Sequence, residues 1–221
     1  MKDIERIIKE RHSVRSYLNK KIEDEKVDQL NNLINEINEK EKLNIQLILN
    51  DSDVFDKYIL HYGRLKNCKN YIALIGKNNN SLEEKVGYFG EKIVLKAQEL
   101  GLNTCWVAGT YKKSSISAII NDGEKLVCII AIGYGETNGK ERKSKKIDDV
   151  TSSINYPEWF KKGLEFALLA PTAMNKQNFK IDYLDDYSVK AEPGKGRMTK
   201  INLGIVKYHF ELGADKKINW K

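Results

Sequence analysis

The sequence has few of the residues that build disulfide frameworks, metal centres and membrane spans. Its 221 residues include three cysteines and three histidines, and neither set shows CxxC, HxxxH or HExxH spacing, so no metal ligand set or Cys–His nucleophile is predicted. An odd number of cysteines favours a reducing, cytoplasmic compartment. The longest apolar run, 126–132, is too short to span a bilayer, and the charged N-terminus does not resemble a signal peptide. We therefore expect a cytoplasmic protein with no membrane partner.

Arginine is also scarce. The 38 basic residues exceed the 31 acidic ones and give a formal net charge of +7, yet only six of the 38 are arginine. The surplus is spread along the chain, which favours small anionic ligands and argues against nucleic acid as a partner. Two of the six, Arg11 and Arg15, lie in one short segment, where planar multi-donor groups can bind a phosphate or a ring carbonyl. A solvated basic turn is the alternative interpretation.

Hydrophobic periodicity predicts an α/β or α+β fold. Helices are expected at 4–8, 22–37, 81–100, 157–170 and 201–214, with shorter ones at 52–60 and 114–120. Strands are expected at 43–49, 70–76, 103–109 and 126–132, and as a pair within 178–192. Ser81 and Glu84 form a capping-box pattern at one helix start, and Gly101 is expected to end that helix.

The middle of the chain predicts a division into two parts. Residues 134–155 contain almost no large apolar side chains, which is typical of a connection that runs over the surface between two halves of a protein. We therefore expect domains at 1–150 and 151–221. A shift of 117 residues pairs Gly87 with Gly204, and two further identical pairs fall in the same predicted helices. This weak echo hints at internal symmetry.

Four segments together resemble motifs of the FMN-dependent nitroreductases. RHSVR (11–15) is similar to the family's RxSxR flavin motif, and GLNTCWVAG (101–109) to its GTCWxGG-like loop. AIGYG followed by ERK (131–143) resembles its glycine turn with basic residues, and APTAMNKQNF (170–179) its APSxxNxQPW block. That block usually follows the first long helix, whereas here it comes after residue 169, with Phe179 in place of the tryptophan.

This order resembles the single-chain, pseudo-dimeric branch of the family. The resemblance implies an α+β fold, a nitroreductase-like α/β sandwich with a mixed sheet flanked by helices. Residues 1–150 would carry the main FMN-binding segments, and 151–221 would stand in for the partner subunit and complete the flavin cleft. The protein would then be a monomer.

The resemblance also implies a set of FMN contacts. Arg11, His12, Ser13 and Arg15 would hold the phosphate, the ribityl chain or the pyrimidine edge, and Arg64 would lie near the C2 carbonyl. Trp106, Val107, Ala108 and Gly109 would line the ring, Arg142 and Lys143 would close on the phosphate, and Pro171, Thr172, Ala173 and Asn175 would cover the flavin from the second half.

The implied activity is that of an FMN-dependent NAD(P)H oxidoreductase. NADH or NADPH would reduce the flavin at N5, and a small organic acceptor such as a nitroaromatic or a quinone would take the hydride in a ping-pong cycle that requires no protein acid or base. Two alternatives stay open. One is a flavin-binding sensor or carrier with little turnover; the other is a basic module that binds phosphate or nucleic acid.

Overall fold

The computed structural model describes residues 2–55, 65–185 and 188–221, which divide into two compact units. The sheet unit comprises Glu10–Leu82 and Ile93–Lys140, and the C-terminal unit comprises Met1–Lys9, Glu83–Lys92 and Glu141–Lys221. The division therefore passes through one long helix. The predicted functional halves, 1–150 and 151–221, stay a prediction.

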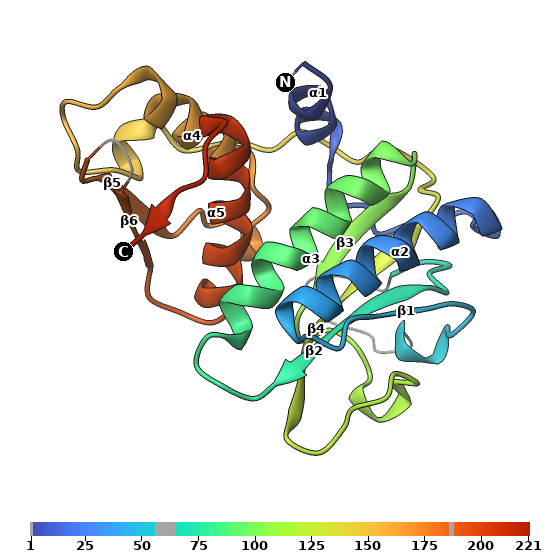
Figure 1. Ribbon diagram of the computed structural model, residues 1–221. Coiled ribbons are helices and arrows are strands. Elements are labelled where there is room, and N and C mark those ends of the chain that lie inside the picture. Colours follow the sequence, from blue (N-terminus) through green and yellow to red (C-terminus); the bar gives the residue numbers. More distant parts are fainter. Residues whose placement is uncertain (1, 56–64, 186–187) are drawn as a thin grey trace. The chain divides into compact units, whose positions relative to one another are not determined.

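The sheet unit is built on an antiparallel sheet (Figure 1). Its strands are β1 (Gln46–Ile48), β2 (Tyr71–Lys77), β3 (Asn103–Val107) and β4 (Glu124–Gly133), in the order β1-β2-β4-β3. The two central strands have the unbroken apolar runs predicted from the sequence, and six of the seven residues of β2 are buried. Phe55, from the short 3-10 helix η1 (Asp53–Phe55), packs edge-on against Tyr71 at a ring distance of 6.1 Å.

A long helix and a short 3-10 turn also belong to this unit. Helix α2 (Asp24–Glu41) lies across the sheet in Figure 1 and buries Leu30, Ile34 and Ile37, the stripe that the sequence predicts. A second 3-10 helix, η2 (Lys113–Ser115), lies between β3 and β4.

The C-terminal unit combines helices with a small mixed sheet. Its elements are α1 (Lys2–Glu10), η3 (Ile147–Asp149), α4 (Glu158–Leu169), η4 (Ala173–Asn175), β5 (Phe179–Tyr183), β6 (Ser188–Pro193), α5 (Thr199–Ala214) and β7 (Asn219–Trp220). Strands β5 and β6 are antiparallel, whereas β6 and β7 are parallel. Helices α4 and α5 pack together through Phe160 and Phe210, whose rings lie 5.3 Å apart.

Helix α3 (Leu82–Glu99) meets α5 at two glycines. A Cβ on Gly87 would lie 2.1 Å from the carbonyl oxygen of Ile201, and a Cβ on Gly204 would lie 1.9 Å from that of Glu84. Both separations are far shorter than any side chain permits, so glycine is required on each helix. The same 117-residue shift relates Gly87 to Gly204 and Glu84 to Ile201. The two contacts are thus reciprocal, as in a two-fold interface.

A buried polar pair lies beside this contact. Glu91 of α3 and His209 of α5 are both fully buried, with Oε1 and Nε2 2.9 Å apart. On the same helices, Lys207 Nζ lies 2.5 Å from Glu84 Oε1. Glu91 Oε1 and His209 Nε2 therefore satisfy each other across the helix contact, as buried polar atoms require.

Two local predictions are wrong. Ser81 does not cap α3, because its hydroxyl donates to Asn79 Oδ1 at 2.9 Å, while Glu84 pairs with Lys207 instead of closing a capping box. The helix expected at 114–120 shrinks to η2, because the amides of Ser117 and Ile119 donate to side chains of the sheet and not to a helical turn. The helix expected at 52–60 begins as η1, and its remainder lies outside the described residues.

We expect Gly204→Ala to destabilise the protein by about 2 kcal/mol, since the new methyl group must push two helix backbones apart. Urea denaturation followed by circular dichroism measures the loss. Gly109→Ala is the control, because a Cβ at that position meets nothing within 4 Å. Equal denaturation midpoints for wild type and Gly204→Ala would show that the helix contact is looser than described.

Candidate functional site

The RHSVR segment runs as a strand-like piece beside β3. Ser13 forms a parallel bridge with Thr104, and the N–H of Val14 donates to the Thr104 carbonyl at 3.0 Å. Further along, the carbonyl of Arg15 accepts from the N–H of Lys66 at 2.8 Å. Neighbouring segments therefore form hydrogen bonds with backbone groups of this segment, and its polar side chains are left for other contacts.

The glycine turn after β4 packs on the same segment. The N–H of Glu136 donates to the Ser16 carbonyl at 2.9 Å, and a Cβ on Gly139, whose φ is +80°, would lie 2.6 Å from His12 Cβ. The turn approaches this closely only because glycine has no side chain. Three of the segments that carry the family resemblance thus meet within the sheet unit.

The two arginines of the segment concentrate positive charge near β3. Arg11 is buried, with 2% of its surface exposed, whereas Arg15 is exposed. Burial raises the pKa of the Cys105 thiol, and the nearby cations Arg15 and Arg11 oppose that rise. The thiol therefore remains protonated at neutral pH and supplies no negative charge. Arg15, the exposed arginine of the two, is accessible to an anionic ligand.

Asn103 holds the glycine turn of the candidate site in place, a role that the sequence analysis missed. Its side chain is buried, and Oδ1 accepts the N–H of Gly135 at 2.9 Å. A Cβ on Gly135 would lie 2.8 Å from the same oxygen, so the residue pair is tightly matched. The only sequence signal was that GLNTCW has asparagine where the family loop has glycine.

The loop that follows β3 offers an open backbone. Val107 is buried, whereas Trp106 and Ala108 are half-buried and Gly109 is exposed. Because a Cβ on Gly109 would meet nothing within 4 Å, a flat ligand can approach the peptide groups there.

In the C-terminal unit, the basic segment and the APTAMNKQNF block come together. Asn175 Nδ2 donates to the Lys143 carbonyl at 2.7 Å. Gln177 Oε1 accepts the N–H of Lys145 at 2.7 Å, and its Nε2 donates to the Leu168 carbonyl at 2.6 Å. Gln177, which was not among the predicted site residues, is thus the side chain that ties the two segments to the end of α4.

Arg142 also binds the end of that helix. Its Nη2 donates to the Leu169 carbonyl, where a cation complements the negative end of the helix dipole. Pro171 is buried, and Thr172 and Ala173 are half-buried beside it.

The turn that follows has unusual backbone geometry. Met174, Asn175 and Gln177 have φ values of 56°, 52° and 45°, a left-handed conformation that costs free energy in residues other than glycine. Asn175 Oδ1 is buried, and no described residue donates a hydrogen bond to it. An acceptor atom is therefore available in this turn. Arg64, the remaining predicted site residue, lies outside the described residues.

A comparison of the sequence with models of protein families shows which family the chain belongs to. A family model with the description "Putative TM nitroreductase" matches residues 3–214. The chain belongs to this nitroreductase family. The expectations of a nitroreductase-like α+β fold and of a family of oxidoreductases are thereby confirmed. No curated protein sequence matches the chain.

Solved structures show the same fold. A "putative nitroreductase" of Thermotoga maritima matches with a TM-score of 0.68 and 23% identity, covering 95% of this chain and 82% of its own. A "putative NADH dehydrogenase/NAD(P)H nitroreductase" of Bacteroides thetaiotaomicron matches with a TM-score of 0.54 and 20% identity over 70% and 96%. A "putative nitroreductase in complex with FMN" from Exiguobacterium sibiricum matches with a TM-score of 0.53 and 17% identity over 66% and 95%.

Two further findings concern this nitroreductase-family chain. In the stretches that the structure describes, no helix combines the length and the apolar character that crossing a bilayer requires. Within the same stretches, no three His, Cys, Asp or Glu side chains gather as metal ligands would.

We expect Asn103→Leu to cost about 1–3 kcal/mol of stability, because a side chain of similar shape leaves the Gly135 N–H without an acceptor. Asn103→Asp keeps an acceptor oxygen and should lose less. Urea denaturation of both variants measures the difference. If the two variants unfold at the same urea concentration, the hydrogen bond to Gly135 is not what holds the turn.

Proposed function

We propose that this nitroreductase-family protein binds FMN and transfers hydride from NADH or NADPH to small organic acceptors such as nitroaromatics or quinones. The observation that carries the proposal is the segment Arg11–Arg15, which packs between β3 and the glycine turn with a positive charge concentrated beside Cys105. The fold shared with a structure titled as an FMN complex supports the same assignment.

The residues of the sheet unit fit FMN chemically. Arg11, Ser13 and Arg15 supply charge-assisted and neutral donors of the kind that bind a phosphate, a ribityl chain or a ring carbonyl, and His12 packs beside them. Because the backbone of this segment is hydrogen-bonded at Val14 and Arg15, it gives these donors a fixed support. The open backbone at Ala108 and Gly109, with Trp106 and Val107, suits a flat ring.

The C-terminal unit would contribute the remaining contacts. The proposal keeps Arg142 and Lys143 as phosphate contacts and Pro171, Thr172, Ala173 and Asn175 as residues that cover the flavin. Asn175 offers the acceptor atom in the left-handed turn. Arg64 stays a proposed neighbour of the C2 carbonyl.

FMN, when bound, supplies the redox chemistry by accepting a hydride and passing it on. The chain's own residues would bind the cofactor, orient its ring and place positive charge where the reduced flavin gains negative charge. Neither Cys68 nor Cys105 is suited to act as a nucleophile, since burial raises the pKa of Cys68 to about 12 and also raises that of Cys105.

We also propose that the second half stands in for a partner subunit, so that the protein works as a monomer. The reciprocal contacts of Gly87 and Gly204 support this, because a chain containing two related halves would repeat each contact under the same residue shift. One FMN per chain and the mass of a monomer in solution are the expected results.

The decisive experiment is to purify the protein, record its absorbance spectrum and titrate it with FMN. A yellow protein whose flavin bleaches under NADH or NADPH and reoxidises with a quinone or a nitroaromatic supports the proposal. Flavin that stays oxidised with both donors favours the sensor or carrier instead. A colourless protein that takes up no FMN contradicts both, and salt-dependent retention of DNA by that protein would favour the basic binding module.

Arg15→Ala should weaken FMN binding by about 1.5–3 kcal/mol, or about 10- to 150-fold in Kd, because an exposed ionic donor is lost. Flavin fluorescence quenching measures the Kd. Arg197→Ala removes an exposed arginine from a turn in the C-terminal unit and serves as the matched control. Wild-type affinity in Arg15→Ala would show that the segment has another role.

A further inference from the structure

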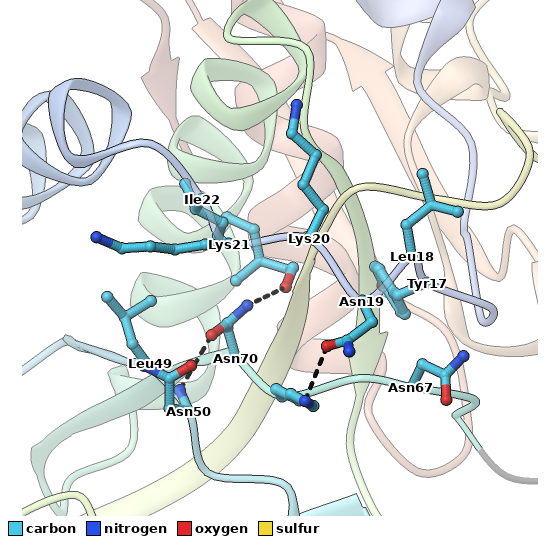
Figure 2. A pocket seen from close by; sticks show the side chains of 13 residues that line it. Tyr17, Leu18, Asn19, Lys20, Lys21, Ile22, Leu49, Asn50, Asn67 and Asn70 are labelled. Carbon is cyan, nitrogen blue, oxygen red and sulfur yellow. Dashed lines mark hydrogen bonds between the residues drawn. The ribbon is translucent and has the colours of Figure 1, made fainter.

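A pocket of about 150 Å³ lies in the sheet unit, at one end of its sheet (Figure 2). It is lined by the residues that follow β1 (Leu49 and Asn50), by residues 67, 69 and 70 before β2, and by the end of β4 (132 and 133). The connection 17–22, which leads into α2, supplies the other residues. None of the proposed FMN contacts lines it. The volume equals that of about five water molecules, which is room for a small polyatomic ligand.

The side chains around this pocket are hydrogen-bond donors over an apolar floor. Three lysines and four asparagines line it, and none of its described lining residues carries a carboxylate. The floor is formed by Tyr17, Ile22 and Ile132, each at most 2% exposed. Cationic and amide donors favour an oxyanion where at least one of the cations has no carboxylate beside it in the described lining.

The three lysines differ in how their charge is balanced. Lys20 lies 3.1 Å from a Glu23 carboxylate oxygen, and Lys21 lies 2.7 Å from one of Asp24. Lys69 Nζ instead donates to the neutral Asn19 Oδ1 at 2.8 Å, the bond drawn to Asn19 in Figure 2. An ammonium group has three donors, and this bond uses one of them. Among the residues that the structure describes, Lys69 is therefore the pocket lysine that is paired with a neutral side chain and not with a carboxylate.

The asparagines give the pocket a fixed frame. Asn70 Oδ1 accepts the N–H of Asn50 at 3.1 Å, and its Nδ2 lies 3.5 Å from the Ile132 carbonyl oxygen, so one amide connects all three strand ends (Figure 2). Asn50 and Asn67 have left-handed backbones, with φ values of 58° and 55°. Strained residues of this kind persist where the surrounding structure holds them, and they cluster at binding sites.

We propose that this pocket binds a small oxyanion, a carboxylate or a phosphate group, through Lys69 with the amide donors of Asn19 and Asn50. The apolar floor would accommodate the carbon skeleton of an organic acid. The proposal does not depend on flavin binding, because the pocket residues and the Arg11–Arg15 segment are different sets.

The test uses the full chain saturated with FMN, or the purified chain if FMN does not bind, at constant ionic strength with chloride as the reference anion. Sodium phosphate and sodium acetate are the probes, followed by amide chemical shifts in a ¹⁵N-labelled sample. We expect saturable shifts confined to 17–22, 49–50 and 67–70. Saturation by phosphate alone identifies a phosphate site, and saturation by acetate a carboxylate site.

Variants at Lys69 separate binding from general charge effects. Lys69→Met should raise the Kd of the bound probe at least tenfold, because a charge-assisted bond is lost, whereas Lys69→Arg should restore most of the affinity. Lys77→Met, at the opposite end of β2, is the matched control and should bind as wild type. Equal affinities in the Met variants at 69 and 77, shifts centred on 11–15, or shifts that do not saturate would overturn the proposal.

Discussion

The hydrogen bonds of the backbone at 13–18 are the constraint on which the candidate site in the sheet unit depends. A segment that binds a ligand through its side chains needs another means of holding its main chain. Val14 joins Thr104 of β3, Arg15 joins Lys66, and Ser16 joins the turn at Glu136. Once these peptide groups are satisfied, an arginine side chain can be exposed without loss of local order.

That arrangement requires close approach of backbones, and glycine supplies it. Gly139 meets Cβ of His12, and Gly135 meets both Val14 and the amide of Asn103. At this close approach the Asn103 side chain accepts a hydrogen bond from the Gly135 N–H. A smaller residue at position 103 would leave that N–H to bond with water. A side chain of the neighbouring strand thus adds to the backbone bonds that hold the turn, and it links the position of the turn to that of β3.

The sequence predicts elements whose signal is local and periodic, and fails where distant side chains decide. The central strands β2 and β4 are unbroken apolar runs, and α5 has a clear apolar face, so their positions follow from the pattern alone. Ser81 looked like a helix cap, but Asn79 binds its hydroxyl. The roles of Asn103 and Gln177 rest on bonds to residues 32 and nine positions away, which leave no periodic trace.

The contact of α3 with α5 gives the weak 117-residue repeat in the sequence a structural counterpart. Identity of Gly87 and Gly204 at a 117-residue shift is no more than two small residues in two helices. In the structure Gly87 lies against the backbone of Ile201, and Gly204 lies against the backbone of Glu84. The shift that relates the two glycines also relates these two partners. Two helices could cross closely with glycines at unrelated positions. Reciprocity is a stronger condition, because one shift of 117 residues relates both contacts.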